Sequence, residues 1–439
     1  MGNEHSRDSH YTDFTFDMFM NSAGKDHAEI TRFNQWRKQV LDAGKYTFQV
    51  PHLGAQRTEV TVQRNTGEEL DLISFASYNY LGYSYHPEVL AAAREALDAY
   101  GLGATGSPVL NGTFKVHEEL EEKLVEFFGL PGYGVTLFSS GYGANLGVVS
   151  GFAHKGDYVV LDRLSHASLF DGAILSQANI KLYKHNDVEH LERVLGRMDY
   201  RNTRILVCTE GVYSADGDIG HVREIVRVAK RYGATVLVDE AHSLLVAGES
   251  GRGVSEEQGV LEEVDMIIGT FSKSFGGVGG CLIAKEDMTT YLNWYARSRM
   301  FSCALDPVVT GGLIKALELA SGPDGDAKRK RLRHNADYLR DKLAGHVDLG
   351  TSHSWIIPVI YKDEHLTIPL SDYLQRAGLD ISLMGFPAVP KNQARIRLFV
   401  TSEHTEDQMD KGAEILLDAA QHFGFDLHER PIHSAIQES

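Results

Sequence analysis

Short apolar runs alternate with amphipathic helical patterns along most of the sequence, and this alternation constrains the fold more than any other feature. The runs are rich in Val, Ile and Leu and are continuous, which is typical of strands buried on both faces. They read, in order, GVTLFSS, YVVLD, RILVCTEG, TVLVDEAHS and MIIGTFSK. Helical patterns such as HPEVLAAAREALDAYG and HEELEEKLVEFFG accompany them. We therefore expect an α/β fold with a mostly parallel sheet flanked by helices.

A turn-rich break, SGPDGD near residue 322, precedes a second and smaller α/β unit. A long charged helix is predicted over 326–345, and we interpret its basic run KRKRLRH (328–334) as one face of a solvated helix. WIIPVIY, LDISLMGF and ARIRLFV follow as predicted strands. A chain of 439 residues is long enough for two packed units. We predict an N-terminal arm over 1–65, a large domain over 66–322 and a small C-terminal domain over 323–439.

Composition excludes several classes of function. The net charge of -17 argues against nucleic-acid binding, which needs clustered Lys and Arg. Cys208, Cys281 and Cys303 are too scattered for a disulfide framework or a zinc site, and the histidines show no metal-type pairing, so we expect no metal. No apolar run is long enough for an integral membrane segment, and the polar N-terminus lacks a signal-peptide core. We expect a cytoplasmic protein; the opening MGNEHS matches the short myristoylation pattern and leaves a peripheral membrane contact open.

The stretch GTFSKSFGGVGG (269–280) contains one charged residue, Lys273, among hydroxyls and glycines. No glycine directly precedes this lysine, so the stretch fails the P-loop pattern. GLGATG (101–106) satisfies GxGxxG, but a helical pattern precedes it where a dinucleotide site needs a strand. It is interpreted as a glycine-rich substrate loop or as a plain structural loop.

Three further motifs follow predicted strands, where ligands bind in such sheets. In FSSGYGANLG, the N–H groups of Ser140, Gly141 and Tyr142 would open a helix and attract a phosphate, although an ordinary strand–helix turn looks the same. In VLVDEAHS, the strand ends in Asp239, either a cation partner or a helix cap, with His242 three residues later. In SHASLFDG, His166 lies in a loop, where a histidine usually has no function.

Together these motifs supply an amine that can form an imine, a carboxylate for a cation, a phosphate cradle and an imidazole that can stack. Pyridoxal phosphate presents an aldehyde, a protonatable pyridine nitrogen and a phosphate. The sequence therefore predicts a pyridoxal-phosphate site in which Lys273 holds the cofactor covalently.

The chain also resembles the α-oxoamine synthases, pyridoxal-phosphate enzymes of fold type I that join an amino acid to an acyl thioester with loss of carbon dioxide. The likeness runs from ASYNYLG (76–82) to RIRLFVTSEHT (395–405). The motifs that carry it, in order, are SYNYLG, LNGTFKVHEELE, SSGYGANLG, LSHASLFDG, EGVYSADGDI, VDEAHS, GRGV and GTFSKSFGGVGG. SYNYLG, LNGT and GTFSKSFG look most like serine palmitoyltransferase, which implies L-serine, palmitoyl-CoA and 3-ketodihydrosphingosine as the product.

The resemblance implies a role for each matching residue. Lys273 would bind the cofactor and later move the Cα proton, Asp239 would pair with the pyridine nitrogen, and His166 would stack on the ring. His242 and Ser214 would lie at the ring oxygen. Ser140, Gly141, Tyr142, Thr270 and Ser272 would hold the phosphate. Asn79 and Arg397 would bind the amino-acid carboxylate. The resemblance further implies a homodimer with a shared site, in which Ser302 reaches the neighbour's phosphate.

Two departures from the family pattern affect the substrate prediction. Many relatives have an Arg-Pro-Pro segment where this chain has Gly385 and Phe386, which puts in doubt a mobile arginine that holds the substrate carboxylate. Pro108 replaces a position that is often basic, so acyl-chain preference could differ. One alternative is a related synthase that uses another amino acid or another acyl thioester, such as an 8-amino-7-oxononanoate type, a 2-amino-3-ketobutyrate type or a polyketide-linked type with the acyl group on a carrier protein. Two further alternatives are a pyridoxal-phosphate aminotransferase and a non-catalytic partner subunit.

Overall fold

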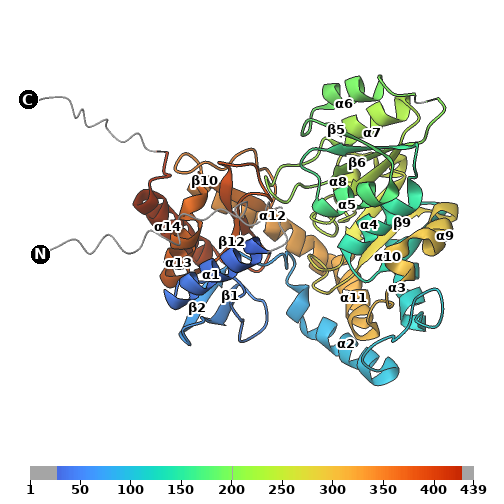
Figure 1. Cartoon of the computed structure of the whole chain (residues 1–439). Helices are drawn as coiled ribbons and strands as arrows, with labels where there is room; N and C mark the ends of the chain where they lie inside the picture. Colours follow the sequence, from blue (N-terminus) through green and yellow to red (C-terminus); the bar gives the residue numbers. More distant parts are fainter. Residues whose placement is uncertain (1–26, 200, 428–439) are drawn as a thin grey trace, which may run out of the picture.

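The computed structural model describes residues 27–199 and 201–427, so the myristoylation-type motif lies outside the described residues. Figure 1 shows two α/β units, with the helix α12 (Pro323–Leu343) running between them. Both ends of the described chain belong to the smaller unit. Within the described ranges, no helix is both long and apolar enough to span a membrane.

A seven-stranded sheet forms the centre of the larger unit, in the order β3-β9-β8-β7-β6-β4-β5. Only β9 runs antiparallel to its neighbours, so the mostly parallel sheet predicted from the sequence is confirmed. The strands are β3 (Tyr133–Phe138), β4 (Tyr158–Asp162), β5 (Asn179–Tyr183), β6 (Ile205–Glu210), β7 (Thr235–Asp239), β8 (Met266–Thr270) and β9 (Gly280–Lys285).

Helices cover both faces of this sheet, and the two faces have separate hydrophobic cores. Leu237 of β7 packs in the core beneath α4 and α5, whereas its neighbours Val236 and Val238 pack in the core on the opposite face. Asp239, two residues after Leu237, is therefore on the α4 and α5 face. The helices on that face are α4 (Gly141–Phe152), α5 (Ala167–Ser176), α9 (Glu286–Tyr295) and α10 (Arg297–Met300).

The remaining helices of the larger unit pack on the other face or at its edge. They are α2 (Pro87–Tyr100), α3 (Lys115–Phe128), α6 (Val188–Leu195), α7 (Val222–Arg231), α8 (Val254–Glu257) and α11 (Pro307–Ala320). Short 3-10 helices occur at Tyr83–Tyr85, Leu261–Glu263 and Glu364–Leu366.

The smaller unit combines segments from both ends of the chain (Figure 1). Strands β10 (Ile356–Lys362), β13 (Ala394–Phe399) and β12 (Ser382–Met384) form one antiparallel sheet. Strands β1 (Glu59–Gln63) and β2 (Glu69–Ser74) pair with β11 (Leu379–Asp380) in another. Helices α1 (Ala28–Asp42), α13 (Thr367–Ala377) and α14 (Glu406–Phe423) complete the unit. The predicted boundary at residue 66 would assign β2 to the large domain, although its partner strands β1 and β11 belong to the smaller unit. The domain division stays a prediction.

The basic run on α12 is not a solvated face throughout. Lys328 and Arg329 are buried, at 6% and 5% exposure. The Lys328 ammonium lies 2.6 Å from a carboxylate oxygen of Glu403, and the Arg329 guanidinium donates to the backbone carbonyls of Ala320 and Leu245. The prediction of a solvated run is wrong for these two residues because α12 packs between the two units.

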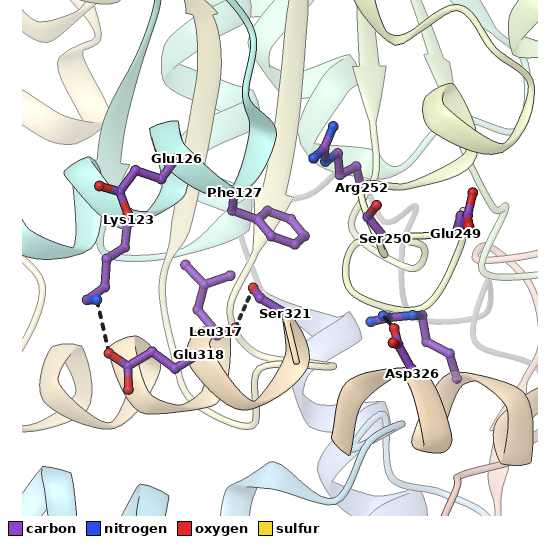
Figure 2. Close-up of a pocket in the computed structure, with 11 residues that line it drawn as sticks. Lys123, Glu126, Phe127, Glu249, Ser250, Arg252, Leu317, Glu318, Ser321 and Asp326 are labelled. Atoms are coloured by element: carbon purple, nitrogen blue, oxygen red, sulfur yellow. Dashed lines mark hydrogen bonds and ion pairs between the residues drawn. The ribbon is translucent and has the colours of Figure 1, made fainter. Parts of the chain in front are cut away.

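A cavity of about 560 Å³ lies where α12 begins. Figure 2 shows the Lys123–Glu318 ion pair on one side of this cavity and Arg252 with Ser250 on another. Phe127 lies between these two groups. This cavity shares no lining residue with the one that contains Lys273.

Candidate active site

The carboxyl ends of β6, β7 and β8 and the first residues of α4 and α5 surround a cavity of about 240 Å³. Nine of the predicted site residues line it: Ser140, Gly141, Tyr142, His166, Asp239, His242, Thr270, Ser272 and Lys273. Asn145, Ser168, Glu210, Ala241 and Ile268 line it as well. The fold thus brings together side chains that lie up to 133 positions apart in the sequence.

Asp239 ends β7 and is buried, at 4% exposure. Its Oδ1 accepts the backbone N–H of Ala241 at 2.9 Å, and its Oδ2 accepts an N–H from Asn145 Nδ2 at 2.6 Å. Among the described residues no cation forms an ion pair with this carboxylate. A buried carboxylate held only by neutral donors is suited to a ligand that brings a positive charge.

Lys273 lies just beyond the end of β8 and lines the same cavity. Burial lowers the pKa of its amine from 10.5 to about 8, against the attraction of Asp239 and Glu210, which raises that pKa. Within the described ranges Lys273 and Asp239 form no ion pair, although they line one cavity. A partly neutral amine can attack an aldehyde, and the space between amine and carboxylate can hold a ligand.

The amino end of α4 provides a cradle for an anion. Ser140 caps the helix, and its Oγ accepts the N–H of Gly143 at 2.9 Å. A Cβ atom on Gly141 would meet Thr270 Oγ1 at 2.6 Å, so only glycine lets the helix approach β8 this closely. Thr270 Oγ1 and Ser272 Oγ lie 2.9 Å apart. Free N–H groups at a helix start and nearby hydroxyls fit a phosphate.

Two histidines border the cavity. His242 is buried, and its Nδ1 lies 2.8 Å from Tyr80 Oη. Burial, with a smaller effect from the charge of Lys273, holds the pKa of His242 well below 6.5. His166 is exposed at the cavity edge, where its Nδ1 lies 2.7 Å from Ser168 Oγ. His242 is therefore neutral at pH 7, which lets one ring nitrogen donate while the other accepts.

Four predicted site residues do not line the cavity. Arg397 donates from Nη1 to Ser214 O and from Nη2 to Ser382 Oγ, both at 3.0 Å, while its buried Nε has no partner. The pKa of His242 is lowered mainly by burial, then by the charge of Lys273 and then by the charge of Arg397. Arg397 is therefore close enough to the site to act on His242 through its charge. The side chain of Asn79 bonds to Ser84 Oγ at 2.8 Å.

Ser302 is the fourth residue outside the cavity. Its Oγ lies 3.2 Å from Ser139 Oγ, one residue before the start of the anion cradle.

Sequence reasoning missed several residues that complete the site. Asn145 stands one helical turn after Gly141, so it shares the face that points at Asp239, and that spacing could have identified it. Glu210 ends β6 directly opposite Asp239 in the ladder, and its carboxylate accepts the backbone N–H of His166. Nothing in the local sequence indicates Trp355. This residue belongs to the smaller unit, and its Nε1 donates to the backbone carbonyl of His242 at 3.0 Å.

Known proteins resemble this chain over most of its length. The family model of aminotransferase class I and II matches residues 71–416. An 8-amino-7-oxononanoate synthase from Thermoanaerobacter pseudethanolicus is 40% identical over 77% of this chain and 85% of that protein. A serine palmitoyltransferase from Sphingobacterium spiritivorum is 36% identical over 90% of this chain and 96% of that protein. A lysine-to-alanine variant of serine palmitoyltransferase from S. paucimobilis, solved with a bound PLP–myriocin aldimine, is 36% identical with a TM-score of 0.85, covering 91% of this chain and all of that one.

The fold and these similarities define the class of protein: the chain belongs to the aminotransferase class I and II family and has the fold of the type I pyridoxal-phosphate enzymes. Within that family it is an α-oxoamine synthase, a pyridoxal-phosphate-dependent acyltransferase. Its cofactor is pyridoxal phosphate. The cavity suits this cofactor because an amine, a carboxylate without a cation and a helix start line it together.

Proposed function

We propose that this enzyme condenses L-serine with palmitoyl-CoA, or a thioester of similar chain length, to 3-ketodihydrosphingosine. The observation that carries the proposal is the similarity to serine palmitoyltransferases, which extends over 90% of the chain in one relative and 91% in one structure. In the balanced reaction, the Cα–H bond of the amino acid breaks and a bond from Cα to the acyl carbon forms. The thioester C–S bond breaks and releases the thiol, the Cα–carboxylate bond breaks and releases carbon dioxide, and a proton returns to Cα.

The bound cofactor withdraws electrons from the Cα atom of the amino acid. In this proposal Lys273 holds the cofactor and then moves the proton at Cα, a task that suits an amine whose pKa is near 8. Asp239 keeps the ring nitrogen protonated. His166 covers the ring and His242, which hydrogen-bonds with Tyr80, donates to the ring oxygen. Ser214 adds a contact near that oxygen.

In this proposal the phosphate is held by the start of α4 and two nearby hydroxyls: Ser140, Gly141, Tyr142, Thr270 and Ser272.

Arg397, with Asn79, is proposed to bind the substrate carboxylate. The buried Nε of Arg397 lacks a partner, and a guanidinium can bind both oxygens of a carboxylate. The Gly385–Phe386 segment offers no guanidinium: the N–H of Phe386 faces Glu364 Oε1 at 3.4 Å and its ring lies 5.2 Å from Lys391 Nζ. Carboxylate binding therefore depends on β13 rather than on this segment.

We further propose a homodimer with a shared active site. Leu110, Leu102 and Phe301 are 83%, 77% and 72% exposed, and Phe301 directly precedes Ser302. A contiguous patch of exposed apolar side chains is typical of an interface, and the segment that holds Leu102 and Leu110 is joined to the one that holds Phe301, because the N–H of Ala304 donates to Gly106 O at 2.9 Å. A second copy seated there would bring Ser302 to its neighbour's phosphate.

The experiment that tests the substrate proposal incubates the pure enzyme with glycine, L-alanine, L-serine and L-threonine, each with pimeloyl, acetyl and palmitoyl thioesters on coenzyme A or a carrier protein. Mass spectrometry identifies the aminoketone, and carbon dioxide release is measured in parallel. We expect L-serine with palmitoyl-CoA to give the highest kcat/KM.

The outcomes separate the alternatives. The 40% identity to an 8-amino-7-oxononanoate synthase makes L-alanine with a pimeloyl thioester the second candidate, and a preference for that pair contradicts the serine proposal. Amino-group exchange with a keto acid, without carbon dioxide release, would indicate an aminotransferase. A partner subunit without activity of its own would give no product with any pair, although this chain retains Lys273, Asp239 and His166.

A further inference from the structure

A loop over residues 211–220 leaves the end of β6 beside the candidate active site. Its two arms pair at a bridge between Val212 and Ile219, and the N–H of Gly211 donates to Asp239 O at 2.9 Å. The loop therefore begins directly beside the end of β7, which carries Asp239.

The tip of the 211–220 loop holds two arginines of the smaller unit. Arg397 donates to Ser214 O at 3.0 Å, and Arg395 donates to Asp216 Oδ1 at 2.6 Å. Arg395 and Arg397 are alternate residues of β13, so both project from the same face of that strand. The position of the Arg397 guanidinium relative to the cavity therefore depends on where this loop lies.

His185 holds the base of the same loop. Its Nε2 lies 2.7 Å from Asp218 Oδ2 in the loop, and its Nδ1 lies 3.0 Å from Asp162 Oδ1 at the end of β4. Asn186 adds hydrogen bonds to both carboxylates, at 2.8 and 2.9 Å. The ring of Tyr213 packs edge-on against the imidazole at 4.5 Å. His185 and Asn186 thus join β4 to the loop, and His185 is the titratable member of the pair.

The charge on His185 lies between the two carboxylates and offsets theirs. Asp162 and Asp218 are 0% and 8% exposed, and within the described ranges their ion pairs are made with His185. Burial by itself would lower the pKa of His185, but the hydrogen bonds and charges of the two aspartates raise it to about 10. A neutral side chain at this position would leave two buried carboxylates without a cation between them.

We propose that His185 is a positioning residue for catalysis: it fixes the 211–220 loop against β4, and the loop fixes Arg397 for the substrate carboxylate. The inference rests on the proposed function, in which Arg397 binds that carboxylate. His185 does not line the cavity, so it acts through the loop and not on the cofactor.

The test compares His185→Gln and Asp218→Asn with the wild-type holoenzyme. His154→Gln is the matched control, because His154 is an exposed histidine between α4 and β4 and lies outside both the loop and the His185 segment. Binding of L-serine and of L-alanine is titrated through the cofactor absorbance, without an acyl thioester. We expect the Kd of the amino acid to rise about tenfold to a hundredfold in both loop variants, as for displaced substrate-orienting groups.

The specificity of the effect separates positioning from general damage. The KM for the acyl thioester should change less than about twofold, and the double variant should bind about as weakly as either single variant, because both remove the same link. Backbone amides of Tyr213 and Gly217, which donate within the loop, should exchange with deuterium faster. Asp218→Asn keeps the test possible if His185→Gln does not fold.

An unchanged amino-acid Kd in a folded loop variant would overturn the inference, and so would unchanged amide exchange. An equal rise in Kd for His154→Gln would also overturn it. Failure of the proposed function has a different signature, because wild-type enzyme would then prefer another pair of amino acid and thioester or form no aminoketone at all.

Discussion

Asp239 and Lys273 face one cavity from neighbouring strands without contacting each other, so each remains available to a ligand. Asp239 is held in place by Asn145 and by the N–H of Ala241, and neither donor neutralises its charge. The carboxylate is therefore already fixed in place and does not have to move when a cationic ring binds to it. This pre-organisation is how a buried charge contributes most to catalysis.

Asp239→Asn tests that charge directly. The amide keeps the shape, but its one oxygen can accept from only one of the two present donors, Ala241 N–H or Asn145 Nδ2, and it does not keep the ring nitrogen protonated. We expect the cofactor to remain bound while kcat falls at least about a hundredfold. Cofactor content is measured by absorbance after gel filtration and kcat by product formation. Asp287→Asn, at an exposed position of α9, is the control, and normal turnover by Asp239→Asn would contradict the assigned role.

The lowered pKa of Lys273 predicts how the enzyme free of cofactor captures pyridoxal phosphate. Only the neutral amine attacks an aldehyde, so the capture rate should rise about tenfold per pH unit below pH 8 and level off above it. Stopped-flow absorbance from pH 6 to 10 measures this profile. A rate that still climbs tenfold between pH 9 and 10 would show an unperturbed amine.

The same pKa has a consequence for stability. Because the unfolded chain holds the proton up to about pH 10.5 and the folded one only to about 8, the unfolded state binds more protons in that window. Raising the pH from 8 to 10.5 therefore favours the folded form through this group, and below pH 8 its unfavourable contribution is constant.

Residue types were easier to predict than residue contacts. An isolated charge or a cluster of glycines at the end of a strand is unusual among its sequence neighbours. This is why Lys273, Asp239 and the start of α4 could be recognised. Glu210, Tyr80 and Trp355 could not be recognised in that way. Each is defined by a partner more than 30 residues away, such as His166 for Glu210 and His242 for Tyr80 and Trp355.

At the scale of elements, the packing of α4 against β8 shapes the anion cradle. Gly141→Ala places a methyl group 2.6 Å from Thr270 Oγ1, so either the helix start or the threonine must move. We expect the affinity for pyridoxal phosphate to fall at least about tenfold, because the phosphate loses aligned N–H groups. Fluorescence titration of the apoenzyme measures this Kd.

Gly54→Ala is the matched control, because a Cβ there meets nothing within 4 Å. Equal affinities of Gly141→Ala and the wild type would show that the cradle tolerates the extra atom and would contradict its assignment.

In the central sheet, the strands that the sequence predicted are mainly those buried on both faces, because they are continuously apolar. β6 and β8 are examples, with every residue buried. β5 was not predicted because it lies at the edge of the sheet and is mostly exposed. β9 was not predicted because its first residues continue the glycine-rich stretch that contains Lys273. Its antiparallel direction depends on contacts with β3 and β8, which no local pattern encodes.

At the scale of the whole molecule, the proposed homodimer makes a prediction about assembly. Leu110→Asp and Phe301→Asp each put a charge on a highly exposed apolar position, and Phe301 directly precedes Ser302. We expect these variants to sediment as monomers with at least about tenfold lower activity, since a buried unpaired charge opposes association.

Ile30→Asp, on α1 in the smaller unit, is the control and should leave assembly unchanged. Sedimentation velocity measures the state of each variant. Wild-type enzyme that is active as a monomer would contradict the shared-site proposal.

The central claim is that Lys273 binds pyridoxal phosphate covalently, and peptide mapping after borohydride reduction tests it most directly. Borohydride converts a carbon–nitrogen double bond into a stable single bond, so the account predicts one modified peptide, containing Lys273, with the mass of the reduced cofactor. Lys273→Ala should yield no modified peptide. The account would be contradicted by modification of a different lysine in the wild type, or by an equal yield of modified peptide from Lys273→Ala.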